Sequence, residues 1–135
     1  MSGLQEGFSL PGEYAARLVQ SAGNPEAIGP LLAEDVTWRL QFPIDPDIMP
    51  SVVHGRAAMV GALDRVFSVY YQEGSLQSTV HQTISQGQSG AALWSMKGLT
   101  STGAPFENRY VLWVKVRNGE ITDAWEFAGT PFGDA

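Results

Sequence analysis

The spacing of apolar residues divides the chain into a helical first half and a strand-rich second half. In residues 11–22 an apolar side chain recurs every four positions, which predicts a helix that ends at Gly23. Asn24 suits the cap of a second, short helix. Residues 56–73 repeat apolar side chains at spacings of three and four, which predicts the clearest amphipathic helix of the chain, closed by Gly74.

The two-residue period of a strand dominates the remainder. Residues 35–42 alternate apolar and polar side chains, as a half-buried strand does. Short turn sequences separate four further expected strands, near 76–86, 91–100, 105–117 and 120–128. The segment 43–54 contains three prolines and is expected to be a surface loop, long enough to act as a lid.

Helices followed by a run of strands predict an α+β domain, with the N-terminal helices packed on one face of a curved antiparallel or mixed sheet. The length of 135 residues and the hydrophobic content of 44% are typical of one globular domain, so a single domain over residues 1–135 is expected. The N-terminus lacks the features of a signal peptide, and no segment approaches the roughly 18 apolar residues of a membrane span. We therefore expect a cytoplasmic protein with no membrane partner.

Charge and residue types narrow the classes of site. The chain has no cysteine and two histidines, which excludes disulfides and thiolate metal sites, so neither a metal nor a cofactor is expected. The net charge is −6, and no run of Lys or Arg forms the stripe that phosphate backbones require. Nucleic acid is therefore not an expected partner.

The register of the final hairpin decides which polar groups share a face of the sheet, because a slip of one residue turns every side chain over. The dipeptide Asn118-Gly119 allows two registers. A two-residue turn would place Tyr110 and Trp125 on one face, whereas a three-residue loop would pair Tyr110 with Glu126. The turn sequence alone favours the two-residue turn.

Three segments resemble a known family: NPEAIGPLLAEDVTW (24–38), HGRAAMVGALDRVF (54–67) and NRYVLWVKVRNGEITDAWEF (108–127). With the order of the elements, they resemble the SnoaL-like family, in the superfamily of nuclear transport factor two and ketosteroid isomerase. The resemblance covers nearly the whole chain and implies a cone-shaped fold with an apolar pocket between helices and sheet. It does not select one chemistry, since the superfamily includes cyclases, isomerases, dehydratases, hydrolases and non-enzymes.

The resemblance favours the three-residue loop. Glu126, in the sequence DAWEF, matches the last-strand acid that acts in the pocket of the related limonene epoxide hydrolase. The inner face of the sheet would then carry polar and apolar residues of three strands, and the helices would close the pocket from above. The expected pocket residues are Glu126, Asn108, Tyr110, Leu112, Leu93, Ser95, Lys97, Trp38, Leu40, Tyr14, Phe67 and Tyr70.

Glu126 is the candidate general base. Burial in an apolar pocket disfavours the charged carboxylate, which raises its pKa toward the range useful for proton transfer at neutral pH. His81 is the candidate partner acid if the strands oppose it to Ser95, because its ordinary pKa lies in that range. The alternative is that Glu126 faces solvent or is neutralised by Lys97 or Arg109.

The register of the three-residue loop would leave an aromatic patch on the outer face of the sheet. Its expected members are Trp94, Met96, Val111, Trp113, Trp125 and Phe127. Monomeric proteins rarely expose apolar patches larger than a few hundred Å². We therefore expect a homodimer packed sheet to sheet.

The expected function is binding of a small hydrophobic carbonyl compound, with proton transfer as in cyclisation, isomerisation or dehydration. Asn108, Tyr110 and Ser95 would donate hydrogen bonds to a carbonyl or enolate. Epoxide hydrolysis is not expected, because the two positions that match the Arg and Asp of that enzyme are Leu93 and Ser95. The alternative is a non-catalytic small-molecule-binding or dimeric association module of the same fold.

Overall fold

A curved, six-stranded mixed sheet organises the computed structural model, which describes residues 10–129. The strand order is β2-β1-β6-β5-β4-β3. Strand β1 runs parallel to β6, and the other neighbours are antiparallel. The strands are β1 (Leu32–Leu40), β2 (Val52–His54), β3 (Gln77–Gln86), β4 (Ser89–Leu99), β5 (Pro105–Arg117) and β6 (Glu120–Ala128).

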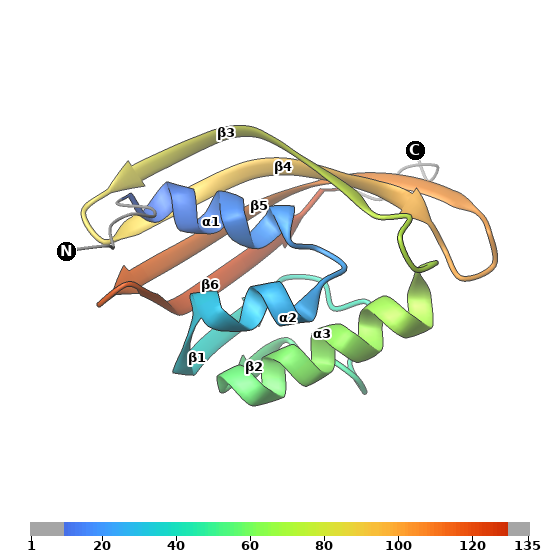
Figure 1. The fold of residues 1–135 in the computed structure, drawn as a ribbon, viewed down its shortest axis with the longest axis horizontal. Coiled ribbons are helices and arrows are strands. Elements are labelled where there is room, and N and C mark those ends of the chain that lie inside the picture. The colour runs from blue at the N-terminus through green and yellow to red at the C-terminus, as the bar shows by residue number, and fades with distance from the viewer. Residues whose placement is uncertain (1–9, 130–135) are drawn as a thin grey trace.

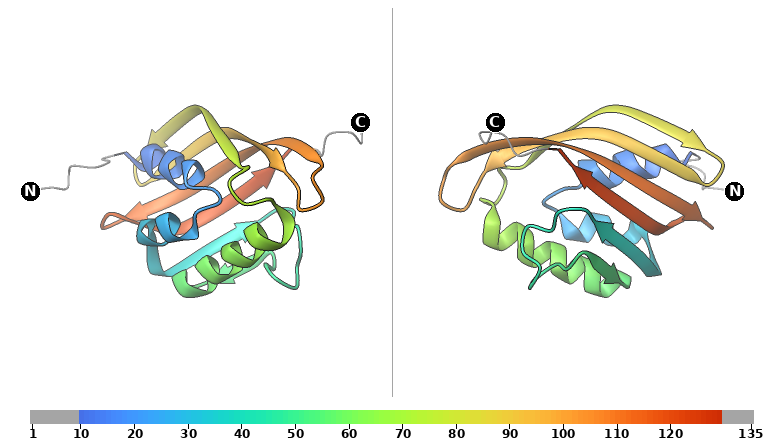
Figure 2. Two further views of the ribbon diagram at one scale, coloured as in Figure 1. Left: turned by 45° about the vertical axis from the view of Figure 1, so that its right-hand side comes forward. Right: turned by 180° about the vertical axis from the view of Figure 1, so that it is seen from behind.

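The helices lie beneath the arch of the sheet, on its concave face (Figures 1 and 2). They are α1 (Pro11–Gln20), α2 (Pro25–Ile28), the short 3₁₀ helix η1 (Gly29–Leu31) and α3 (Arg56–Tyr70). Helix α1 packs on β3, β4 and β5, whereas α3 packs on β1 and β2. Their apolar faces and the inner face of the sheet form the core, whose most deeply buried large side chains are Ile28, Leu32, Met59, Leu112, Ile121, Val19, Val36 and Val114.

Local sequence explains how α1 meets the sheet. Pro11 occupies the first turn, where its missing N–H costs nothing, and the Glu13 carboxylate accepts the Leu10 N–H at 3.1 Å. A Cβ at Gly90 of β4 would overlap the backbone of Pro11 and Gly12. Glycine is therefore needed at position 90 for this close approach of helix and strand.

The predicted α+β class is confirmed, and the sheet is mixed. Three helical segments and five strands lie where the sequence predicts them. The three-residue strand β2 was not expected; it lies inside the predicted loop and pairs with β1 through Trp38 and Val53. Within residues 10–129, no helix is both long enough and apolar enough to cross a membrane.

Candidate functional site

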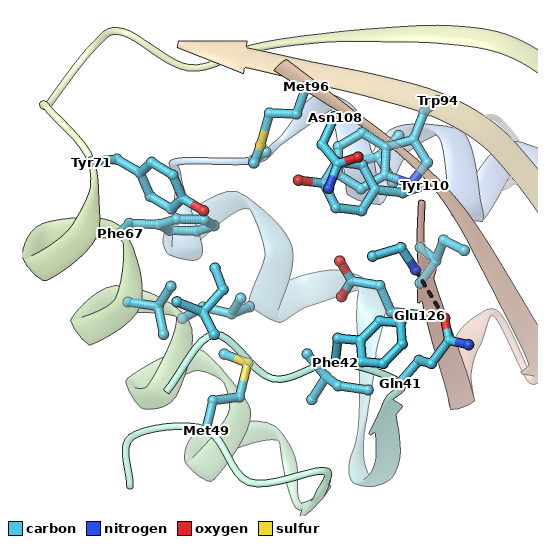
Figure 3. A pocket seen from close by; sticks show the side chains of 18 of the residues that line it. Gln41, Phe42, Met49, Phe67, Tyr71, Trp94, Met96, Asn108, Tyr110 and Glu126 are labelled. Atoms are coloured by element: carbon cyan, nitrogen blue, oxygen red, sulfur yellow. Dashed lines mark hydrogen bonds between the residues drawn. The ribbon is translucent and has the colours of Figure 1, made fainter. Parts of the chain in front are cut away.

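A cavity of about 990 Å³ opens between the helices and the concave face of the sheet. Its walls come from α1, α2, α3, the loop after β1, and strands β1, β4, β5 and β6. Figure 3 shows Tyr71 and Phe67 facing Glu126 and Tyr110 across the cavity. Most of the wall is apolar, so the few polar groups determine what chemistry the cavity supports.

A bulge in β6 turns Glu126 into this cavity. The turn is the two-residue type, because Arg117 pairs with Glu120 and both Asn118 and Gly119 have positive φ, 52° and 75°. The pairing then shifts between Val116–Ile121 and Lys115–Asp123, which leaves Thr122 as one extra residue on β6.

The expected three-residue loop and its pairing of Tyr110 with Glu126 are therefore wrong. Tyr110 pairs with Ala128, and Leu112 pairs with Glu126. The extra residue nevertheless places Glu126, Leu112 and Tyr110 on one face, as the three-residue loop would have done. The Asn118-Gly119 dipeptide therefore predicts the turn type correctly, and the bulge determines that Glu126 lies on the inner face.

Glu126 is a carboxyl group in an apolar environment. Desolvation raises its pKa from 4.5 to about 7. Its side chain keeps some accessible surface, but that surface faces the cavity rather than bulk water. Neither Lys97 nor Arg109 contributes to its pKa, so the alternative of a neutralising cation finds no support.

The Trp38 indole N–H is the polar group that approaches Glu126. It favours the charged carboxylate and so lowers the pKa of Glu126, though by less than burial raises it. Trp38 is 2% exposed, and its Nε1 lacks a well-aligned hydrogen-bond partner. The contact is therefore an approach of donor to carboxylate rather than a complete hydrogen bond.

Two phenols share the cavity with Glu126. Burial, and then the nearby Glu126 charge, raise the pKa of Tyr71 to about 12. Burial also raises the pKa of Tyr110 well above 10, with smaller contributions from Tyr71 and Glu126. Both hydroxyls therefore keep their protons at neutral pH and are available as hydrogen-bond donors.

Asn108 lies beside Tyr110 in the cavity wall. The Asn108 Oδ1 accepts the Arg109 backbone N–H at 2.8 Å, which assigns the amide NH₂ to the other side of the group. The Asn108 side chain favours the charged form of the Tyr110 hydroxyl and so lowers its pKa, though by less than burial raises it. As with Trp38 and Glu126, the two groups approach each other without a well-aligned hydrogen bond.

Seven of the predicted pocket residues line the cavity: Trp38, Leu40, Phe67, Asn108, Tyr110, Leu112 and Glu126. Two aromatic residues of the expected roof do not. Tyr14 packs against the core, and Tyr70 donates its hydroxyl to Asp45 Oδ2 at 2.7 Å, which ties the loop after β1 to the end of α3.

The predicted faces of β4 are wrong. Even-numbered residues of β4 pair with even-numbered residues of β5, as Trp94 does with Tyr110 and Met96 with Asn108. Trp94 and Met96 therefore line the cavity instead of the outer patch. Leu93, Ser95 and Lys97 point outward.

His81 is not a pocket residue. It is the extra residue of a bulge in β3, between Val80 and Gln82. Its Nε2 lies 2.7 Å from the Ser95 Oγ, so the predicted neighbours do meet, but both lie on the outer face. The expected roles of His81 as acid and of Ser95 as donor are therefore contradicted by their position.

Sequence reasoning missed several wall residues. The helical pattern over 56–73 includes Tyr71, which lies just after α3, and the predicted register puts Trp94 and Met96 on the other face. The alternation over 35–42 predicts Gln41 and Phe42 as strand residues, but β1 ends at Leu40 and both belong to the loop that lines the cavity. Gln41 Oε1 accepts the Ala128 N–H at 3.3 Å, which holds this loop beside the end of β6 (Figure 3).

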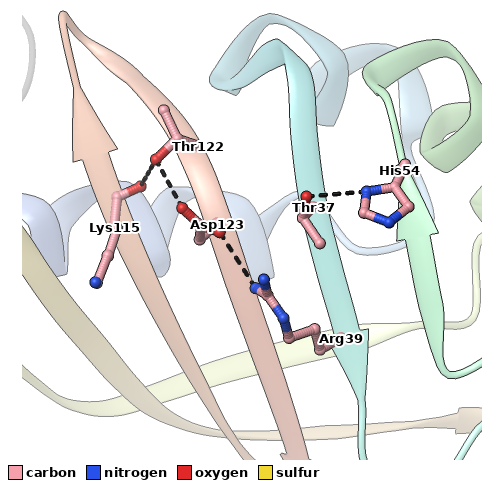
Figure 4. Close-up of polar contacts among 6 residues, drawn as sticks. All are labelled: Thr37, Arg39, His54, Lys115, Thr122 and Asp123. Atoms are coloured by element: carbon pink, nitrogen blue, oxygen red, sulfur yellow. Dashed lines mark hydrogen bonds and ion pairs between the residues drawn. The ribbon is translucent and has the colours of Figure 1, made fainter.

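The outer face carries a separate polar strip (Figure 4). Arg39 Nη1 lies 3.2 Å from Asp123 Oδ1, and the Arg39 guanidinium stacks over Trp125 at 4.6 Å. The Thr122 Oγ1 lies 3.4 Å from the Lys115 carbonyl, across the bulge. Among residues 10–129, no three His, Cys, Asp or Glu side chains gather as a metal site would require.

The sequence profile of the SnoaL-like domain matches residues 13–124. Similar solved structures include a protein of Catenulispora acidiphila with a ketosteroid isomerase-like fold in complex with trimethylamine (TM-score 0.69, 19% identity, 87% of this chain and 85% of that chain). An NTF2-like protein of Anabaena variabilis has a TM-score of 0.72 and 19% identity, over 87% of this chain and 85% of that chain. An NTF2-like protein of Burkholderia pseudomallei has a TM-score of 0.75 and 14% identity, over 90% of this chain and 92% of that chain. These likenesses show the fold alone. No curated protein matches the chain significantly.

Proposed function

The chain belongs to the SnoaL-like domain family, and we propose that it binds a small, mostly apolar carbonyl compound and moves a proton on it, with Glu126 as the general base. The observation that carries this proposal is the environment of Glu126. Its carboxyl faces an apolar cavity, and burial raises its pKa to about 7. A base with a pKa near the working pH combines a useful charged fraction with enough proton affinity.

The proposed step uses two groups of the cavity. The Glu126 carboxylate takes a proton from the carbon beside the substrate carbonyl, and the electrons of that C–H bond form a C=C bond. The carbonyl oxygen then gains the negative charge and accepts a hydrogen bond from the Tyr110 hydroxyl. In a β,γ-unsaturated ketone, return of the proton from Glu126 to the γ carbon moves the C=C bond into conjugation and gives an isomer. The same first step begins a cyclisation when the carbanion attacks a second carbonyl, or a dehydration when a β-hydroxyl group leaves as water.

Asn108 and Trp38 support this step. The approach of the Asn108 amide to Tyr110 favours an orientation in which the Tyr110 hydroxyl directs its proton to another acceptor. The approach of the Trp38 N–H favours the charged form of Glu126 that acts as base. His81 and Ser95 lie on the outer face and take no part.

Exchange of carbon-bound protons tests the proposal without knowledge of the natural substrate. We expect the protein to accelerate deuterium exchange of the protons on the carbon next to the carbonyl of an apolar ketone such as 2-tetralone. Proton NMR in D₂O measures this exchange as loss of their signal. The rate should rise as Glu126 ionises around pH 7. Glu126→Gln should lower it by roughly 10² or more, the usual contribution of a general base.

Asp123→Asn is the matched control, because this carboxylate lies on the same strand but faces Arg39 on the outer surface. It should leave the exchange rate unchanged. If the ketone shifts the NMR signals of cavity residues while exchange stays at the rate of free carboxylate buffer, the chain is a non-catalytic binding module. Retention of the rate in Glu126→Gln would reject Glu126 as the base.

A further inference from the structure

The cavity holds a carboxylate that no cation of the wall balances. Among the described residues that line it, the polar members are Gln41, Tyr71, Glu107, Asn108, Tyr110 and Glu126, and none is Lys, Arg or His. The segments outside residues 10–129 contain none of these three residue types either. An ionised Glu126 is therefore a buried charge without a counter-ion from the protein.

Aromatic rings line the same cavity. Trp94 stacks on Tyr110 with ring centroids 4.5 Å apart, and Tyr71 lies 5.0 Å from Phe106 on the same measure. These four rings and Trp38 all belong to the cavity wall. The face of an aromatic ring carries partial negative charge and attracts a cation, most strongly where water is excluded.

The basic residues lie elsewhere in the fold. Lys97, Arg109 and Lys115 are exposed at positions of β4 and β5 that point away from the cavity, and Arg39 pairs with Asp123 on the outer face. The charged groups that a ligand meets on the cavity wall are therefore acidic, and the basic residues of β4 and β5 lie on the opposite side of the sheet. A cationic ligand meets no like charge on the cavity wall.

We propose that the cavity binds a small organic cation, an ammonium group with apolar substituents, whose charge is balanced by the Glu126 carboxylate and whose alkyl groups pack against the aromatic rings. This inference goes beyond the proton-transfer function and does not depend on it. The chemical class follows from the combination present in the wall: a buried carboxylate at Glu126, a second and exposed one at Glu107, several aromatic rings and no Lys, Arg or His among the described residues.

Binding of the cation must be linked to ionisation of Glu126. Helices α1 and α2 line the cavity with apolar residues alone, so the titratable groups facing Glu126 are Tyr71, which follows α3, and Tyr110 on β5. Glu107, at the rim of the cavity, is exposed and pairs with Lys97. Both phenols remain neutral because their pKa values are raised. Since the pKa of Glu126 is about 7, its ionised fraction falls roughly tenfold between pH 8 and pH 6.

Two probes of equal shape test the proposal. Choline carries a quaternary ammonium, and 3,3-dimethyl-1-butanol replaces its nitrogen with carbon and has no charge. We expect choline to bind the full-length protein about tenfold more tightly than the alcohol at pH 8, measured by NMR titration of the tryptophan indole signals. The preference for choline should shrink by about the same factor at pH 6, whereas alcohol binding should not change.

Two isosteric variants identify the charge responsible. Glu126→Gln should abolish the preference for choline and leave alcohol binding intact, which also shows that the cavity still forms. Glu107→Gln, at the other acid of the wall, is the control and should keep the preference. Equal affinity for the two probes, no saturable binding of choline, or a preference that survives Glu126→Gln would each overturn the proposal. Ketone exchange is measured separately, so loss of one activity leaves the other testable.

Discussion

Two carboxylates on β6 lie three residues apart and occupy opposite faces of the sheet. Asp123 faces outward, where Arg39 lies 3.2 Å away and the strip of Figure 4 is open to water. Glu126 faces the cavity, where burial raises its pKa to about 7 and no wall residue carries a positive charge. The same functional group is thus a paired surface charge on one face and a candidate base on the other.

The comparison shows that position in the sheet, rather than residue type, assigns chemistry in this fold. A carboxylate with a cation beside it is already stabilised in its charged form, so it has little tendency to bind a proton or a ligand cation. An unpaired carboxylate in an apolar wall is stabilised by binding a proton or a ligand cation. Asp123 and Glu126 face opposite sides because they lie three positions apart in a strand, and the bulge at Thr122, which precedes both, determines which of the two points inward.

Deletion of Ala124 should have the largest effect. With the bulge at Thr122 retained, the residues after position 124 move back by one pairing position, which turns Glu126 outward and brings the Trp125 and Phe127 side chains into the core. We expect the free energy of unfolding to fall by more than about 4 kcal/mol, measured by urea denaturation. Deletion of Thr122 is the control and should cost less, because it removes only the extra residue and leaves Glu126 opposite Leu112. Equal losses in the two deletion variants would show that the register after the bulge does not set the face.

Glu126→Gln should change how stability depends on pH. The folded-state pKa of Glu126 is raised from 4.5 to about 7, so the folded protein binds more protons than the unfolded chain in that interval. The free energy of unfolding therefore falls as pH rises through it, by about 3 kcal/mol from this group, and is constant above it. The difference between wild type and Glu126→Gln, from urea titrations at several pH values, isolates this contribution.

Asp123→Asn provides the comparison for the outer face. It removes the Arg39 ion pair, which is partly exposed, so a change of about 1 kcal/mol or less is expected. For Glu126, the free energy of unfolding of the wild type should decline between pH 4.5 and 7 when that of Glu126→Gln is subtracted. A constant difference would contradict the burial of the Glu126 charge.

The outer face should bind a second copy of the chain. Leu93, Trp113 and Phe127 are 42%, 45% and 42% exposed on three neighbouring strands, and no described element covers them. Trp113→Glu should weaken association by about 2 kcal/mol, roughly thirtyfold, as loss of a central aromatic residue does. Sedimentation at several concentrations measures this effect. Val69→Glu is the control, because Val69 is 49% exposed on α3, on the other side of the sheet. A wild-type protein that stays monomeric would refute the dimer.

The sequence predicted the elements well because their patterns are local. Apolar spacing located α1 and α3, and the turn dipeptide at 118–119 gave a two-residue turn, as found. The resemblance to the SnoaL-like family placed Glu126 in the pocket, which neither spacing nor composition does. The short strand β2 was not predicted, because three residues are too few to show the period of a strand.

The composition of the site was harder to predict, because it depends on strand pairing across loops and bulges. The length of the loop at 100–104 decides which residues of β4 share a face with those of β5. The sequence does not give this register, and the wrong register put Ser95 and Lys97 on the inner face in place of Trp94 and Met96. Bulges at His81 and Thr122 each move one residue out of register, and no local sequence rule marks either. Tyr71 and Gln41 enter the wall through tertiary packing of irregular segments.

His81→Ala should have the smallest effect and tests the outer assignment of this histidine. Its hydrogen bond to Ser95 lies on the exposed surface, so its loss should cost about 1 kcal/mol or less in free energy of unfolding. The ketone exchange rate and the choline preference should both stay within twofold of wild type, because the imidazole does not reach the cavity. Ser95→Ala serves as the matched variant, since it removes the same bond from the other partner. If His81→Ala alone slowed exchange tenfold with stability unchanged, the imidazole would have to enter the cavity in another conformation, and the division of the sheet into a reactive inner face and an inert outer face would fail.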